Sequence, residues 1–129
     1  MTISDRLKKA LSFLQENQWG KYHTRLREAD GTYTYCAEGA IRWGAFSELA
    51  RTDEHGHEHT PDGEGVSKAI RFMDRHAEEM AREMELSGAW GIDELYEFND
   101  HGQTTRDDVI ALFQRAITDA EAKEKATVA

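Results

Sequence analysis

The first stretch of the chain alternates apolar and polar residues with the period of a helix. Leu7, Ala10, Leu11 and Leu14 follow the i, i+3, i+4, i+7 spacing of one helix face. This pattern predicts a helix from Ser4 to about residue 18, with Ser4 as its N-cap.

The helical spacing of apolar residues ends at Trp19 and Gly20. We predict that Gly20 closes the first helix in a left-handed conformation and that Trp19 folds back onto the core. Residues 21–27 and 32–35 then form two β-prone runs around an Asp-Gly turn signal, which predicts a short hairpin. An isolated hairpin is unstable, so we expect it to lie on the helices.

Helical spacing returns in the rest of the chain. The pattern predicts a buried helix over 36–50, a long amphipathic helix over 66–86, one or two turns over 93–98, and a last helix that begins behind a Thr105/Asp108 capping box. We interpret 52–65 as a mobile, histidine-rich loop and 122–129 as a frayed tail. The predicted fold is a single mainly α domain over 1–129, with about four helices and a short β-hairpin between helices one and two.

The composition of the chain indicates the cellular compartment in which it folds. The chain has 129 residues, a formal net charge of −9 and one cysteine, Cys36. One cysteine excludes a disulfide framework within the chain and fits a reducing compartment, so we expect a cytoplasmic protein. The N-terminal stretch carries charges among its apolar residues, and we expect neither a signal peptide nor a membrane segment.

The charge is unevenly distributed along the chain. Residues 1–51 hold eight Lys/Arg against six Asp/Glu, whereas residues 52–129 hold eight against nineteen. This acidic second part would repel phosphates, so we expect no nucleic-acid partner there, and a basic protein partner would fit it. The simpler interpretation of the same charge is a solvated acidic surface that keeps the protein soluble. The oligomeric state stays open.

Three short segments carry a resemblance to a known group. They are Trp19-Gly20, the run Cys36-Ala37-Glu38-Gly39-Ala40, and Phe98-Asn99-Asp100 followed by Thr104. With them the chain resembles an uncharacterised family of small proteins, a domain of unknown function, from actinobacteria and their phages. The resemblance implies an accessory protein that acts inside the host cell, and it implies no catalytic residue. The chain departs from the family pattern at Phe98, where Trp is usual, and at Gln103, where Arg is usual.

Cys36 provides the sharpest hint of an enzyme. A cysteine at a helix N-terminus is a setting that lowers the thiol pKa, and His23 or His101 could serve as its base. A thiol-dependent hydrolase or transferase is therefore one alternative. Buried single cysteines are common core residues, and we favour that interpretation.

A second alternative is a metal-binding module. His55, His57 and His59 stand at every second position, which places them on one side of an extended strand. The segment is interrupted by glycine and offers no group to orient the rings, so we favour adventitious binding and expect no resident cofactor.

The interpretation that we favour is a non-enzymatic protein that binds a host or phage protein. Aromatic and acidic residues gather before the last helix, a composition that suits a protein-binding surface and the edge of the core equally well. The predicted contact residues are Trp90, Asp93, Glu94, Glu97, Phe98, Asn99 and Asp100. Asn99 and Asp100 have a simpler interpretation as turn formers.

Overall fold

The structure is a computed structural model that describes residues 1–44, 51–52, 54–55, 58–59 and 63–128. Helices predominate, and a small sheet lies between the first two of them, which confirms the predicted fold class. In chain order the elements are α1 (Ile3–Glu16), β1 (Gln18–Trp19), β2 (Arg25–Arg27), β3 (Tyr33–Tyr35), α2 (Ala37–Gly44), β4 (Arg51–Thr52), β5 (Glu58–His59), α3 (Gly63–Glu83), the 3-10 turn η1 (Ala89–Gly91), α4 (Leu95–Asp100) and α5 (Arg106–Val128).

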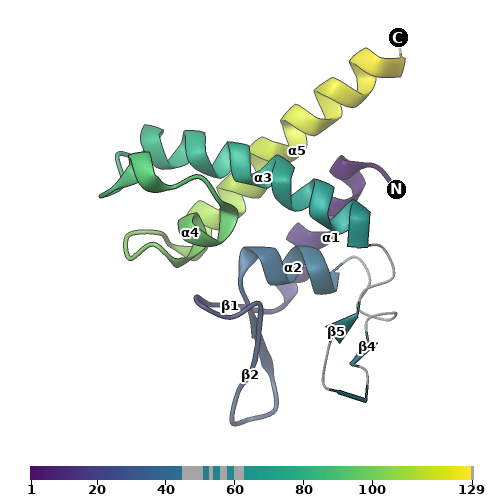
Figure 1. The fold of residues 1–129 in the computed structure, drawn as a ribbon, viewed down its shortest axis with the longest axis vertical. Coiled ribbons are helices and arrows are strands. Elements are labelled where there is room, and N and C mark those ends of the chain that lie inside the picture. Colours follow the sequence, from purple (N-terminus) through teal and green to yellow (C-terminus); the bar gives the residue numbers. More distant parts are fainter. Residues whose placement is uncertain (45–50, 53, 56–57, 60–62, 129) are drawn as a thin grey trace.

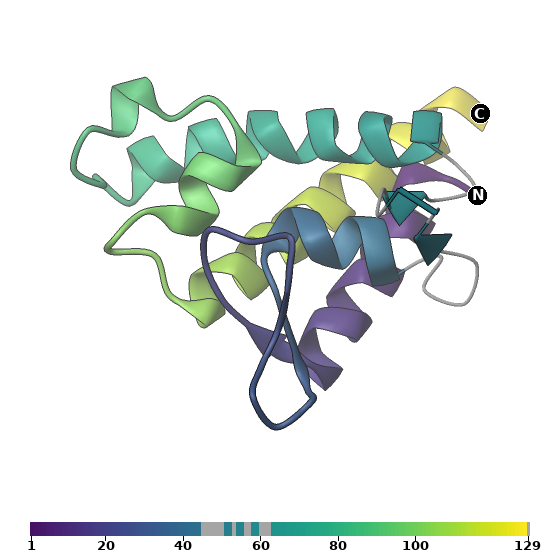
Figure 2. The same cartoon turned by 60° about the horizontal axis from the view of Figure 1, so that its bottom comes forward.

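The helices cross around one apolar core. Figures 1 and 2 show α3 and α5 crossing, with α1 and α2 packed beside them and α4 at one end. The largest fully buried side chains come from α1, α2, α3, α4 and α5, which means that every α-helix contributes to the same core. They are Phe98, Phe113, Leu7, Leu14, Ile41, Met73, Leu95, Leu112, Val66, Val109 and Asn99. Asn99 is the polar member of this set.

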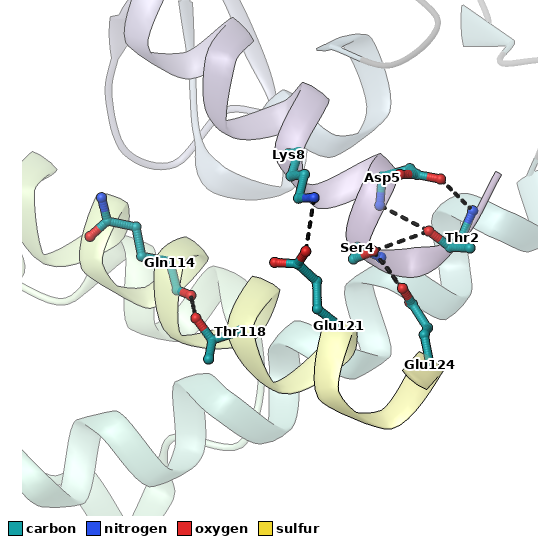
Figure 3. Close-up of polar contacts among 8 residues, drawn as sticks. All are labelled: Thr2, Ser4, Asp5, Lys8, Gln114, Thr118, Glu121 and Glu124. Atoms are coloured by element: carbon teal, nitrogen blue, oxygen red, sulfur yellow. Dashed lines mark hydrogen bonds and ion pairs between the residues drawn. The ribbon is translucent and has the colours of Figure 1, made fainter. Parts of the chain in front are cut away.

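The start of α1 differs from the prediction. Thr2, not Ser4, is the N-cap: its hydroxyl accepts the Asp5 N–H at 3.1 Å, and the Asp5 carboxylate accepts the Thr2 N–H at 3.3 Å. Ser4 lies inside the helix and bonds to the last helix instead. Its N–H and hydroxyl donate to the two carboxylate oxygens of Glu124, at 3.1 and 2.5 Å (Figure 3).

The contact between α1 and α5 continues along both helices. Lys8 Nζ lies 3.0 Å from Glu121 Oε2, one turn further along α1 than the Ser4–Glu124 contact (Figure 3). The chain from residue 122, where we predicted fraying, is helical as far as Val128. Residues beyond the last buried turn of α5 therefore still contact the first turn of α1.

The sheet contains the predicted hairpin and one strand that we did not predict. β2 and β3 pair antiparallel around Gly31, which has a φ of 87°, while β1 pairs with β3 in parallel. The prediction that Gly20 closes α1 in a left-handed conformation is wrong, because α1 ends at Glu16 with Asn17 as its C-cap, and the chain continues as a strand. Gly20 instead makes room for Thr34, whose Cγ2 would lie 2.4 Å from an added Cβ.

The predicted loop over 52–65 is partly ordered into secondary structure. β4 and β5 pair antiparallel, with Arg51 opposite His59, and α3 already begins at Gly63. Residues 53, 56–57 and 60–62 of that segment, and the predicted end of α2 at residue 50, lie outside the described residues.

Candidate functional site

Asn99 is completely buried and joins three parts of the chain. Its Oδ1 accepts the indole N–H of Trp19 at 2.7 Å and the backbone N–H of Ala37 at 2.9 Å. Its Nδ2 donates to the Gly20 carbonyl and to Asp100 Oδ1, both at 3.0 Å. All four hydrogen bonds that this amide usually makes are present, so Asn99 is a structural centre and not the turn former that we predicted.

The end of α4 fixes the chain between β1 and β2. In addition to the bond from Asn99 to Gly20, the Asp100 carboxylate accepts the Tyr22 N–H at 2.8 Å. Lys21 Nζ donates to the His101 carbonyl at 2.5 Å. Three consecutive residues, 20–22, are thus tied to three consecutive residues, 99–101, and we call this arrangement the clamp.

Cys36 belongs to the same region, at the start of α2. Its Sγ accepts the Gly39 N–H at 3.3 Å, and its carbonyl accepts the Ala40 N–H at 2.9 Å. Asn99 binds the next free amide, that of Ala37. The first turn of α2 is therefore capped by a sulfur and a buried amide, which satisfies donors that a helix start leaves open.

The Cys36 thiol lacks the lowered pKa that the thiol-dependent alternative requires. Burial raises its pKa to about 11, and this outweighs the hydrogen bond from Gly39, which acts in the other direction. The residue is only 4% exposed. A thiol that stays protonated and enclosed at neutral pH is a poor nucleophile.

Neither candidate base is bonded to this thiol within the described part of the chain. His101 Nδ1 accepts the Gln103 N–H at 3.0 Å, which leaves Nε2 to donate to the Ser87 carbonyl at 2.7 Å. Both of its ring nitrogens are therefore in use. His23 is exposed in the segment before β2. The structure does not assemble the predicted pair of Cys36 with an imidazole.

The aromatic and acidic residues near α4 separate into a buried and an exposed group. Phe98 and Asn99 are wholly buried, so in this structure they are not available to a partner. Trp90 is 80% exposed and Tyr96 50% exposed. The exposed side of α4 and its approach carries Asp93, Glu94, Tyr96, Glu97 and Asp100, and we call these five residues the acidic surface.

Repulsion between carboxylates is visible in this surface. The pKa of Glu97 is raised, mainly by burial, and further by Asp93 and Glu94. The pKa of Tyr96 is raised as well, first by Glu94 and then by Glu97. Each shift favours the less negative form of the group, as expected where negative charges are crowded.

Asp74 of α3, which we did not predict as a site residue, lies directly behind the acidic surface. Its Oδ1 accepts the Leu95 N–H at 2.7 Å, and so it supplies the cap that Glu94 leaves unmade at the start of α4. Burial raises its pKa, and Glu94 and Glu38 add to the shift. The only sequence signal for this role is a carboxylate on a long helix, which is too common to single it out.

No described cation compensates the acidic surface. In the part of the chain that the structure describes, no lysine, arginine or histidine forms an ion pair with its four carboxylates. Carboxylates elsewhere on the helices are paired, among them Glu78, Glu79, Asp119 and Glu121. What distinguishes this surface is that four such carboxylates lie within eight residues of the chain, from Asp93 to Asp100.

The predicted metal site is described only in part. His55 is exposed, with Nε2 3.5 Å from Glu54 Oε1. His57 lies outside the described residues, and only the backbone of His59 is described, in β5. Among the described residues, no group of three or more His, Cys, Asp or Glu side chains could hold a metal ion. As for membranes, no described helix is both long and apolar enough to cross one.

The fold and this region define a small, mainly helical protein in which short sequence motifs meet in one hydrogen-bonded structure. The motifs are Trp19-Gly20, the start of α2 and the end of α4, which Asn99 joins. The chain belongs to a family of unknown function, DUF6197, whose model matches residues 1–119. No curated protein and no solved structure matches the chain.

Proposed function

We propose that this chain is a non-enzymatic binding protein whose acidic surface contacts a basic segment of a protein partner. The supporting observation is that its carboxylates crowd one another and none forms an ion pair with a described cation, whereas Glu78, Glu79 and Glu121 on the longer helices do. A lysine-rich or arginine-rich segment would supply the missing charges. Complementary charge of this kind speeds association and selects the partner.

Exposed aromatic rings support the same proposal. Tyr96 lies within the acidic surface, and Trp90, shortly before it in the chain, has the Arg82 guanidinium 4.2 Å from its ring centroid. Aromatic side chains contribute disproportionately to the binding free energy of protein interfaces. A cationic side chain can also pack its methylene groups against an aromatic ring while its charge meets a carboxylate.

We also propose that the protein is an accessory protein of actinobacteria or their phages and acts in the cytoplasm of the host. The support is the resemblance carried by the three motifs, together with the single cysteine. Phage genes on both sides of the coding sequence in its genome would agree with this origin. A position among housekeeping genes of another bacterial group would contradict it.

A thiol-dependent enzyme is not part of this proposal, because the Cys36 thiol is buried and its pKa is raised. The metal-binding alternative stays a prediction from the sequence, since His57 lies outside the described residues.

A direct binding measurement tests the proposal. The probe is a short fluorescent peptide in which lysine alternates with glycine and serine, and its control carries glutamate in place of lysine. We expect the lysine peptide alone to bind, with an affinity that falls as salt is added. Reversing two charges with Glu94→Lys and Glu97→Lys should weaken binding by about 30-fold, from about 1 kcal/mol for each reversed charge.

The matched control is the double variant Glu16→Lys/Asp107→Lys. Both residues are exposed, on α1 and at the start of α5, and the change in net charge is the same. This variant should keep the affinity of the unmodified protein. Equal weakening in both double variants, or equal binding of the lysine and glutamate peptides, would show that the acidic surface is not a specific site.

A further inference from the structure

Tyr22 has an unusual combination of backbone and side-chain properties. Its φ is 73°, in the left-handed region that bulky side chains rarely adopt, and its side chain is among the most exposed large apolar ones, at 73%. Burial of the ring therefore does not compensate for the strained backbone. A strained conformation persists only where the surroundings enforce it, and such positions are often functional.

The clamp is what enforces this conformation. The Tyr22 N–H is held by Asp100 at 2.8 Å, while the carbonyl of Gly20 and the ammonium of Lys21 are held by Asn99 and the His101 carbonyl. These contacts involve the backbone or the neighbours of Tyr22 and leave its ring free. The end of α4 thus determines where an exposed tyrosine ring is presented.

The backbone of Tyr22 lies at the edge of the acidic surface. Asp100, which holds the Tyr22 backbone, follows Tyr96 by one helical turn, so the two lie on the same side of α4. The negative charge of Asp100 is also among those that raise the pKa of Tyr96. Figure 2 shows the connection from β1 to β2 passing beside α4, in agreement with these contacts.

We propose that Tyr22 is a contact residue of the acidic surface, and that it and Tyr96 flank the carboxylates that receive a lysine or arginine side chain of a protein partner. This inference rests on the proposed function. The ammonium or guanidinium would meet Asp100 and Glu97, while its methylene groups pack on the two rings. Phosphate-bearing partners such as nucleic acids or anionic membranes would be repelled by the same carboxylates.

The test uses a substitution for which stability and binding should respond differently. Tyr22→Gly removes the ring and also removes the strain, since glycine adopts a positive φ freely. We expect the melting temperature to stay the same or rise. Affinity for the lysine peptide should fall about fivefold, as expected for the loss of one aromatic contact with a cation.

Two further variants separate the ring from the backbone. Tyr22→Phe keeps the ring and should bind the peptide as the unmodified protein does. Glu85, the other described non-glycine residue with a positive φ, at 55°, provides the matched control. Glu85→Gly relieves the same kind of strain and should leave peptide affinity within about twofold of the original, because one surface charge outside the acidic surface contributes little.

Each outcome is decisive. Unchanged affinity of Tyr22→Gly, together with lost affinity of Glu94→Lys/Glu97→Lys, would overturn the role of Tyr22 and leave the proposed function in place. A lower melting temperature of Tyr22→Gly would show that the ring supports the fold, which also overturns it. If the unmodified protein binds no lysine peptide, the proposed function fails and the inference about Tyr22 fails with it.

Discussion

Replacement of Asn99 by alanine should destabilise the protein more than most single substitutions. The truncation removes the acceptor of the Trp19 indole and of the Ala37 N–H, and the donor to the Gly20 carbonyl. A buried polar group left without a partner costs about 1–3 kcal/mol. Trp19 and Gly20 are only half-buried, so the lower part of that range applies to them, and we expect a total loss of about 3–5 kcal/mol.

This loss is measurable by urea unfolding, followed by both circular dichroism and tryptophan fluorescence. It is a large part of the roughly 5–15 kcal/mol that stabilises a typical domain. The control is Asn17→Ala at the only other asparagine of the chain. Asn17 Nδ2 makes one hydrogen bond, to the Phe13 carbonyl at 2.8 Å, so its loss should cost about 1 kcal/mol.

Asn99→Asp tests the same reasoning through pH. The substitution keeps the two accepted bonds but places a buried negative charge beside Asp100. Burial and the charge of Asp100 both raise the pKa of the new carboxyl group in the folded state. A raised carboxyl pKa means that the folded state binds more protons than the unfolded state, so stability falls as pH rises through that pKa. We expect this variant to be more stable at mildly acidic pH than at neutral pH. An Asn99→Ala variant as stable as Asn17→Ala would refute the central role of Asn99.

Three other substitutions or modifications have clear expected outcomes. Gly39→Ala should cost more than about 3 kcal/mol in the same urea titration, because the added Cβ would lie 1.7 Å from the Thr24 carbonyl oxygen. Asp74→Asn keeps an acceptor for the Leu95 N–H and removes a charge, so it should stabilise by about 0.5 kcal/mol at neutral pH. That gain should shrink as pH falls toward the ordinary carboxyl range, because the Asp74 carboxylate, with its raised pKa, is protonated in the folded state at a higher pH than in the unfolded state. A gain that stays constant with pH would show that the charge of Asp74 is not its cause. The Cys36 thiol should react with Ellman's reagent only after unfolding in urea, and rapid reaction of the native protein at neutral pH would show that it is not enclosed.

Local patterns were sufficient to predict most of the helices. The spacing of apolar residues located α1, α3 and α5, and the Thr105/Asp108 capping box marks the start of α5 as predicted, with bonds of 2.9 and 3.2 Å. The turn at Gly31 located the hairpin. These features depend on residues that are close in sequence, and a periodic pattern records them directly.

Contacts between distant residues could not be predicted in the same way. Asn99 has the composition of a turn former, yet its partners are Trp19, Gly20 and Ala37, and no sequence pattern identifies partners so far away. Cys36 shows a related difficulty: a helix N-terminus lowers a thiol pKa and burial raises it, and the sequence does not indicate which effect is larger.

Glu79 has a long-range partner where its position on the helix would allow a local one. It stands four residues after Arg75 on α3, the spacing of a helical ion pair, but its carboxylate lies 2.9 Å from Arg115 of α5. The pair Glu78–Arg82, at the same spacing, does form, at 2.9 Å. The order of acid and base along the helix favours Glu78–Arg82 over Arg75–Glu79, and the neighbouring helix α5 gives Glu79 a different partner.

The contact between Ser4 and Glu124 bears on where this protein can be shortened. The family match ends at residue 119, whereas Glu121 and Glu124, which bind Lys8 and Ser4, come after it. A recombinant piece trimmed to the matched region would retain the core except Ala120 and would leave the Ser4 N–H and hydroxyl without Glu124 as their acceptor. Its first helix should then exchange backbone hydrogens faster than that of the whole chain, so that the last ten residues act as an intramolecular ligand for the beginning of the molecule.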